Sequence, residues 1–211
     1  KFAEKNNAKF LFASSSEAYG EPLEHPQKEE YRGNVSTTGP RSVFDESKRF
    51  GETLTAYYFR DKNLDARIAR IFNTYGPNMH KDDLRMIVSF IIQALKNEPI
   101  TIFGDGSQTR SLCYIDDLIE GLVKLMFGAN TKGEIVNLGN PEEHTVKEFA
   151  EIVKELTNSQ SEIVFSESLP KDDPMRRQPD ITKAKTLLSW EPKVALSDGL
   201  TRMIEYIKTI I

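Results

Sequence analysis

The chain has 211 residues, 38% hydrophobic and 28% charged, a composition that can bury a sizeable core and stay soluble. Lys and Arg number 28 against 32 Asp and Glu, and this net charge of −4 argues against a general nucleic-acid binder. No apolar run approaches the roughly 18 residues of a transmembrane helix, the start is too polar for a signal peptide, and the single cysteine excludes an intramolecular disulfide. We therefore expect a globular, cytoplasmic protein that binds neither nucleic acid nor membrane.

Strand and helix patterns alternate in the first third of the chain. Residues 9–14 form a short apolar run that ends in small polar residues, as in a buried strand. A polar loop with Pro and Gly follows from residue 20 to residue 40. Residues 42–60 carry an apolar stripe at helical spacing, and residues 65–72 again have the pattern of a strand.

The middle of the chain continues with a turn at Tyr75-Gly76-Pro77, a helix over residues 83–96 and a brief strand over residues 100–103. Gly104-Asp105-Gly106 ends that strand, and we interpret it as a turn because no third glycine and no clear helix start follow. No complete G-x-G-x-x-G phosphate-binding motif occurs anywhere in the sequence.

The last third of the chain repeats the alternation. Thr145 followed by Glu148 is a capping-box signature, which specifies the start of one helix. Helices are expected over residues 116–127, 146–156, 183–188 and 198–210, and strands over residues 134–138 and 162–165. This alternation indicates an α/β fold with a largely parallel sheet. A second lobe would be built from the segments after Pro77 and would interleave with the first.

Hydroxyl and carboxyl side chains follow the first predicted strand, at Ser14-Ser15-Ser16-Glu17. In open α/β sheets the carboxyl ends of the strands border the ligand site, so these groups are placed to hydrogen-bond a substrate or to transfer a proton. A solvated turn would have the same composition, because serine is common in turns.

Phe44 and Lys48 lie four residues apart in the predicted helix, so they share one of its faces. A lysine on an apolar stripe is unusual, although a lysine at the edge of the stripe can extend its ammonium into water. Guanidinium groups that suit phosphate or carboxylate occur at Arg41, Arg85, Arg110, Arg176 and Arg177. The three histidines have no metal-ligand spacing, so we expect no metal site.

Six stretches of the sequence match motifs of one enzyme family. They are residues 13–20 (ASSSEAYG), 39–49 (GPRSVFDESKR), 70–77 (RIFNTYGP), 104–110 (GDGSQTR), 137–145 (NLGNPEEHT) and 172–180 (DDPMRRQPD). Through them the chain resembles, nearly throughout, the extended short-chain dehydrogenase/reductase (NAD-dependent epimerase/dehydratase) family of nucleotide-sugar enzymes. Within that family it is most similar to the UDP-glucuronate decarboxylases, or UDP-xylose synthases.

The resemblance implies the C-terminal part of a Rossmann-like parallel sheet that binds NAD, with a smaller interleaved lobe that binds a UDP-sugar. Residues 1–77 would belong to the NAD-binding domain, to which later segments return, and residues 78–211 mainly to the nucleotide-sugar lobe. A homodimer is also implied, with the helix of Lys48 in the interface. The family reaction oxidises carbon 4 of the glucuronate ring, the β-keto acid loses CO₂, and bound NADH reduces the ketone to give UDP-xylose.

The resemblance also assigns roles to individual side chains, motif by motif. Ser15 resembles the hydroxyl that partners the catalytic tyrosine, and Ser16 and Glu17 resemble the pair beside the sugar carboxylate. Lys48 resembles the lysine that holds the nicotinamide ribose and lowers the pKa of the tyrosine. The implied cofactor contacts are Phe44, Lys48 and Thr74. The implied substrate contacts are Arg41, Asn73, Arg85, Arg110 and Arg177.

Two features depart from the family pattern. The family motif is Tyr-x-x-x-Lys, and Phe44 occupies its first position, so no hydroxyl there can take the proton from the sugar. The chain also begins just before what would be the fifth Rossmann strand, without the glycine fingerprint and the ribose-binding acid. We therefore expect an uncovered sheet edge and impaired or absent turnover by this chain.

Two alternative functions stay open. One is a dTDP-glucose 4,6-dehydratase or UDP-glucose 4-epimerase, and the other is a non-catalytic subunit for nucleotide-sugar binding or dimerisation. The order Ser15-Ser16-Glu17 favours decarboxylation, since the resembling dehydratases carry Thr-Asp-Glu there and the epimerases usually lack the Glu.

Overall fold

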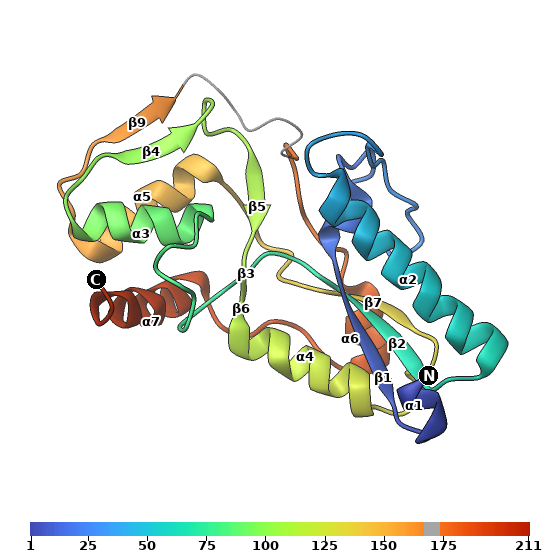
Figure 1. Ribbon diagram of the computed structural model, residues 1–211. Helices are drawn as coiled ribbons and strands as arrows, with labels where there is room; N and C mark the ends of the chain where they lie inside the picture. Colours follow the sequence, from blue (N-terminus) through green and yellow to red (C-terminus); the bar gives the residue numbers. More distant parts are fainter. Residues whose placement is uncertain (167–173) are drawn as a thin grey trace.

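A sheet of three parallel strands organises the first part of the fold (Figure 1). The computed structural model describes residues 1–166 and 174–211, and it confirms the predicted α/β class with parallel strand pairing. The strands are β1 (Phe10–Ser15), β2 (Ala66–Ile71) and β7 (Ile135–Leu138), in the order β1-β2-β7. All three end at the same edge of the sheet, which is where open α/β sheets bind ligands.

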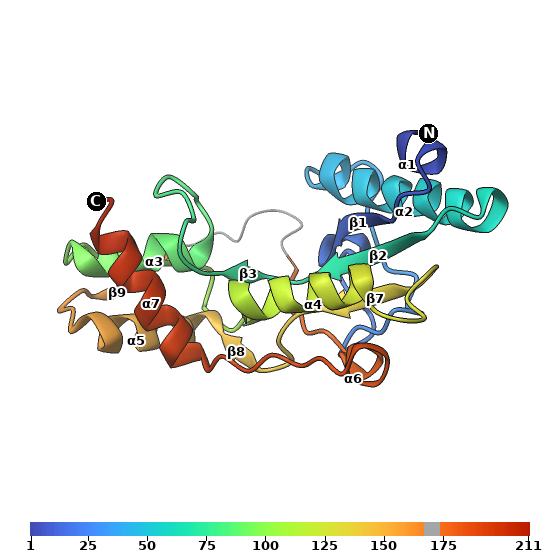
Figure 2. The same ribbon diagram turned by 90° about the horizontal axis from the view of Figure 1, so that it is seen from below.

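Helices cover both faces of this sheet (Figure 2). Helix α2 (Ser42–Lys62) packs on one face, and α4 (Ile115–Phe127) and α6 (Thr182–Leu188) pack on the other. Gly51 permits the close approach of α2, because a Cβ atom there would lie 2.1 Å from the ring of Phe12. The opposite face is filled by an apolar cluster of buried side chains, namely Ala69, Cys113, Leu118, Leu125, Val136, Leu138, Ile181, Ala184, Leu188 and Trp190.

A second apolar cluster lies away from the three-stranded sheet. It is enclosed by α3 (Met86–Leu95), α5 (Val146–Thr157), α7 (Leu196–Lys208) and the parallel pair of β4 (Ile100–Phe103) and β9 (Ile163–Ser166). Segments after residue 77 therefore contribute to both clusters, since α4, β7 and α6 pack with the first. The domain boundary at residue 77 stays a prediction.

Several short elements were not predicted from the sequence. They are α1 (Phe2–Lys5), the 3₁₀ turn η1 (Ser16–Tyr19), β3 (Thr74–Tyr75), β5 (Thr109–Ser111), β6 (Cys113–Tyr114) and β8 (Glu143–Thr145). Strand β3 pairs with β6, and β5 pairs with β8. Elements of two to four residues are too short to show a hydrophobic period, so the pattern of side chains cannot reveal them.

One predicted helix start was wrong for a local reason. Helix α3 begins at Met86 rather than at Asp83, because the Asp83 carboxylate accepts the backbone N–H of Arg85 at 3.0 Å and holds the segment in a turn. The predicted capping box is confirmed: Thr145 Oγ1 accepts the N–H of Glu148 at 3.1 Å, and the Glu148 carboxylate accepts the N–H of Thr145 at 2.7 Å.

Two further sequence-based expectations concern the last family motif and membrane-spanning helices. Asp172 and Asp173, which open the last family motif, lie outside the described residues. Within residues 1–166 and 174–211, no helix is both long enough and apolar enough to cross a membrane.

The thiol of Cys113 offers a direct test of the packing around β6. The side chain is fully buried, and burial raises its pKa to about 12. In the unfolded chain the thiol has a pKa of about 8.5. Between the two pKa values the unfolded chain binds fewer protons than the folded chain, so the free energy of unfolding falls as pH rises. We expect DTNB at pH 8 to label Cys113 slowly in the folded protein and at once in concentrated urea. Rapid labelling without denaturant would contradict this packing.

Candidate active site

A cleft of about 530 Å³ opens at the carboxyl ends of β1 and β2 and extends toward the second apolar cluster. Residues from distant parts of the chain meet in it. Among those predicted from the sequence, Ser15, Glu17, Arg41, Phe44, Asn73, Thr74, Arg85, Arg110 and Arg177 line the cleft. The strand ends thus bring together side chains separated by up to 162 positions, as expected for a parallel α/β sheet.

Glu17 lies between two arginines at one wall of the cleft. Its Oε2 atom is 2.8 Å from Arg41 Nη2 and 3.1 Å from Arg177 Nη2. Arg177 is only 2% exposed, and its Nη1 also donates to the carbonyl of Ser16 at 2.8 Å. Burial lowers the pKa of Arg177, while the charge of Glu17 opposes that shift. Two guanidinium groups face one carboxylate, so this wall suits an additional anion such as a carboxylate or phosphate.

The two serines after β1 have different surroundings. Ser15 lines the cleft, and its Oγ accepts the N–H of Glu17 at 3.2 Å, which holds the start of η1. Ser16 is 1% exposed and does not line the described part of the cleft, although the sequence placed it beside a substrate carboxylate. Its carbonyl instead anchors Arg177, so the structure gives Ser16 a supporting position.

Phe44 and Lys48 share the face of α2 that points toward the end of β1. Lys48 Nζ donates to the carbonyl of Ala13 at 3.0 Å and lies 5.4 Å from the centre of the Phe44 ring. The Phe44 ring is half-exposed at the cleft, whereas Lys48, which was also predicted to belong to the site, does not line the described part of the cleft. An ammonium has three N–H donors, and the bond to Ala13 uses one of them, so this group suits the hydroxyls of a ribose.

Asn73 and Thr74 enter the cleft where the chain leaves β2 for β3. The carbonyl of Asn73 accepts the N–H of Cys113 at 2.9 Å, and Thr74 Oγ1 donates to the carbonyl of Phe72 at 2.9 Å. Both residues are therefore held by backbone bonds at the crossing between the two clusters.

The remaining predicted arginines stand on the opposite side. Arg110 belongs to β5, opposite His144 of β8, and its Nη1 donates to the carbonyl of Thr109 at 2.8 Å. Arg85 is exposed at the rim and binds Asp83, with Nη2 and Oδ2 2.5 Å apart. These bonds hold the Asp83 pKa below its ordinary value. A ligand would therefore compete with Asp83 for Arg85.

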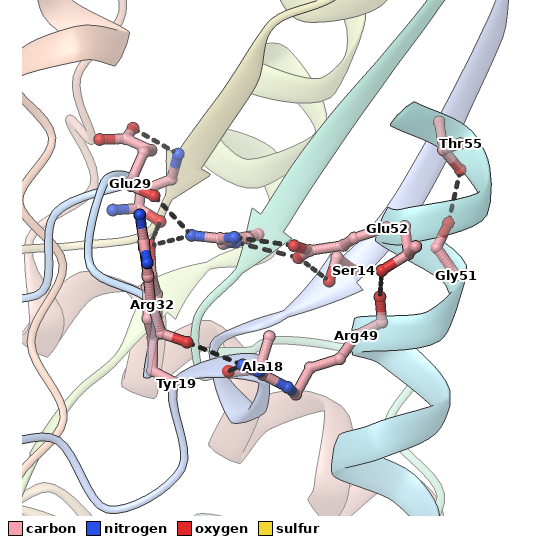
Figure 3. Close-up of polar contacts among 12 residues, drawn as sticks. Ser14, Ala18, Tyr19, Glu29, Arg32, Arg49, Gly51, Glu52 and Thr55 are labelled. Atoms are coloured by element: carbon pink, nitrogen blue, oxygen red, sulfur yellow. Dashed lines mark hydrogen bonds and ion pairs between the residues drawn. The ribbon is translucent and has the colours of Figure 1, made fainter. Parts of the chain in front are cut away.

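A buried network behind the cleft holds the end of β1 in place (Figure 3). Arg70 makes a two-pronged ion pair with Glu52, at 2.9 Å from Nε to Oε1 and 2.7 Å from Nη2 to Oε2. Glu52 also accepts the hydroxyl of Ser14 at 2.5 Å, which ties α2 to the residue that precedes Ser15. Arg70 Nη1 donates to the hydroxyl of Tyr19 at 2.9 Å.

Tyr19 extends this network to β7. Its hydroxyl donates to Asn137 Oδ1 at 2.8 Å, and burial raises its pKa to about 12. The first strand, the second strand and β7 are thus joined through polar side chains at the ligand edge of the sheet. The sequence did not predict this network, because its members lie far apart along the chain.

Much of the cleft wall is apolar and lies on the side of the second cluster. Met79, Leu84, Met86, Ile87, Phe90, Phe103, Leu112 and Val146 form it. Gln108, also missed from the sequence, lines this wall at 3% exposure, and its Nε2 donates to the carbonyl of Phe103 at 2.7 Å. The Gln108 Oε1 atom is buried without a partner in the described residues. The cleft therefore has a cationic wall, with Arg41 and Arg177, and an apolar wall that contains the Gln108 amide.

Known proteins are similar to this chain in sequence and in fold. Residues 1–139 match the model of the NAD dependent epimerase/dehydratase family. UDP-glucuronic acid decarboxylase 4 from Arabidopsis thaliana is 52% identical over 203 residues, which cover 96% of this chain and 45% of that protein. UDP-glucuronic acid decarboxylase 1 from Danio rerio is 50% identical over 206 residues, which cover 97% of this chain and 48% of that protein.

The fold is also found among solved structures. UDP-glucuronic acid 4-epimerase from Bacillus cereus, in complex with UDP-glucuronic acid and NAD, has a TM-score of 0.86 and 34% identity, over 96% of this chain and 62% of that one. The chain spans about half the length of the curated relatives it matches. Since the family model matches residues 1–139 of 211, the chain belongs to the NAD dependent epimerase/dehydratase family.

Proposed function

We propose that this chain is the sugar-binding and catalytic-helix part of a UDP-glucuronate decarboxylase, which converts UDP-glucuronate to UDP-xylose. The observation that carries this proposal is Glu17 held by Arg41 and Arg177 at the wall of the cleft, where a carboxylated sugar finds a positive excess. The 52% identity to a protein named UDP-glucuronic acid decarboxylase supports the same substrate.

The proposed reaction assigns a task to each wall of the cleft. Arg41 and Arg177 hold the sugar carboxylate and the pyrophosphate, and Arg110 and Gln108 hold the nucleotide against the apolar wall. Oxidation of the ring hydroxyl at carbon 4 gives a β-keto acid, whose ketone accepts the electron pair released with CO₂. Reduction of that ketone then yields the pentose. Ser15 hydrogen-bonds the reacting hydroxyl at the end of β1.

The residues present fit one end of NAD. Lys48 would hold the nicotinamide ribose, and Thr74 and Phe44 would border the ring. Bound NAD would supply the hydride acceptor for oxidation and the hydride donor for reduction. The glycine fingerprint that binds the pyrophosphate is not in this sequence, so these residues account for part of the cofactor contact only.

A homodimer through α2 is part of the same proposal. Val43, Phe50, Leu54 and Tyr57 are apolar or aromatic side chains on α2 that stay exposed in the single chain. Contact with a second α2 would remove them from water. We also propose that the NAD-binding domain and the nucleotide-sugar lobe divide at residue 77, and that the protein is cytoplasmic.

Selective binding tests the proposed substrate. The test protein is this chain fused to the N-terminal half of the Arabidopsis thaliana relative, here the fusion protein. Because Phe44 has no hydroxyl, substrate should bind without being consumed, so calorimetry can compare UDP-glucuronate with UDP-glucose at equilibrium in the presence of NAD. Charge-assisted hydrogen bonds contribute about 1.5–3 kcal/mol, so we expect UDP-glucuronate to bind about 10–150-fold more tightly.

The control is Arg177→Met, which should reduce that preference, while Arg41, Arg110 and Gln108 still bind UDP, more weakly than before. Equal or tighter binding of UDP-glucose by the unchanged fusion protein would contradict the proposed substrate and favour a 4-epimerase or dehydratase acting on a neutral sugar.

A further inference from the structure

A second cavity, the back chamber, adjoins the cleft on the other side of Glu17 and Arg41. Its volume is about 310 Å³, and Glu17, Arg41 and Pro174 line both spaces, so they form the wall between them. Asp45 lines the back chamber only, within the described residues. A cavity of this size has room for several water molecules.

The back chamber reaches the protein surface. Its outer lining includes Glu21, Asn34 and Ser36, all of which are exposed. Its inner end is closed by Glu17 and Asp45, which are largely buried. Polar side chains therefore line the space from bulk water to the wall of the cleft. Among the described residues, no group of three or more His, Cys, Asp or Glu side chains is arranged to hold a metal ion.

Asp45 is the unusual residue of the back chamber. It lies in the first turn of α2, is 6% exposed, and its Oδ1 atom is buried without a hydrogen-bond partner in the described part of the chain. The charges that act on it are Glu17 from η1, Arg41 before α2, Arg177 from the C-terminal segment and Glu46 from α2 itself.

Burial, followed by the charge of Glu17, raises the pKa of Asp45, while the two arginines oppose the shift. A buried carboxylate with an unsatisfied oxygen is costly, and protonation turns it into a hydrogen-bond donor instead. Asp45 is therefore suited to keep a proton next to a second carboxyl group.

The proposed decarboxylation needs such a proton. When the bond between the ring carbon and the carboxylate breaks, its electron pair stays on the sugar and is shared with the ketone. A new C–H bond must then form at that carbon, so each CO₂ released consumes one proton from outside the substrate. The redox steps return their hydride and supply no net proton.

We propose that the back chamber is the proton-entry route of this reaction, and that Asp45 holds the proton there and passes it to Glu17 at the shared wall. This inference rests on the proposed function. Asp45 does not reach the cleft, so it acts through Glu17 and is a positioning and relay residue.

The test uses Asp45→Asn in the fusion protein that also carries Phe44→Tyr. The amide keeps the shape and cannot release a proton at this site, so we expect kcat for CO₂ release to fall about 10²-fold or more. KM should stay unchanged, the solvent deuterium isotope effect on kcat should rise, and Asp45→Glu should restore part of the rate. Glu46→Gln is the matched control, because that neighbour pairs with Arg49 at 3.5 Å on the exposed surface.

An unchanged kcat and isotope effect in Asp45→Asn would overturn the relay. Failure of the Phe44→Tyr protein to release any CO₂ would instead overturn the proposed function. If no CO₂ is released, carboxyl NMR of the present chain, isotopically labelled at its aspartates, still tests whether Asp45 holds a proton. The resonance lost in Asp45→Asn should titrate above the ordinary aspartate value of about 3.9, and titration at or below it would exclude the role.

Discussion

Phe44→Tyr in the fusion protein is expected to raise the turnover of UDP-glucuronate by about 10²–10⁴-fold, the usual contribution of a general acid–base group. The Phe44 ring lines the cleft, so a hydroxyl added to it would reach the bound sugar. Lys48 Nζ, 5.4 Å from the ring centre, would stabilise the deprotonated phenol and make it a better base. The measurement is CO₂ release with NAD present.

Phe50→Tyr is the matched control for this gain. It adds the same hydroxyl to the same helix, but the Phe50 side chain is 68% exposed and does not line the described cleft. It should leave turnover at the background rate. Equal activity in both variants would show that position 44 is not the acid–base position. No CO₂ release by Phe44→Tyr despite bound NAD and UDP-glucuronate would contradict the proposed decarboxylation itself.

Glu52→Gln is expected to lower the free energy of unfolding of this chain by about 3–5 kcal/mol, the usual cost of removing one partner from a buried ion pair. The Glu52 and Arg70 side chains are each 11% exposed, so water cannot replace the lost contact. The variant leaves the Arg70 guanidinium buried without its anion, and it weakens the bond to Ser14. Urea unfolding followed by circular dichroism measures the change.

Asp61→Asn provides the comparison, since its pair with Arg60 lies on the surface at 2.9 Å with side chains 44% and 70% exposed. An exposed pair contributes at most about 1 kcal/mol, so this variant should unfold near the wild-type midpoint. A cost for Glu52→Gln no larger than that of Asp61→Asn would mean that the network in Figure 3 does not support the end of β1.

The long elements of this fold were predictable because each buries one continuous stripe or run of side chains. The apolar residues of α2, the run that forms β1 and the capping box at Thr145 all act within a few neighbouring positions. Strands β3, β5, β6 and β8 depend instead on partners far along the chain. Their two or three residues gain their conformation from pairing, which no local pattern records.

The residues of the candidate site likewise fall into those that the sequence predicted and those that it did not. Family motifs indicated Glu17, Phe44 and four arginines that the structure brings together in one cleft, whereas Arg176 is exposed and does not line its described part. Gln108 and Asp45 were missed, because an amide or carboxyl on a polar segment looks solvated until tertiary packing buries it. The Glu52–Arg70 pair was missed for a related reason: it joins a helix to a strand 18 positions away.

The product formed from UDP-glucuronate by the Phe44→Tyr fusion protein separates the closest alternatives. The matched curated relatives are named as decarboxylases of UDP-glucuronic acid, whereas the Bacillus cereus structure is named as its 4-epimerase. Mass spectrometry of the nucleotide product tests this directly. A decarboxylase gives a UDP-pentose together with CO₂, which is the expected result. A UDP-uronic acid of unchanged mass, with no CO₂ released, would contradict decarboxylation and assign the cleft to epimerisation.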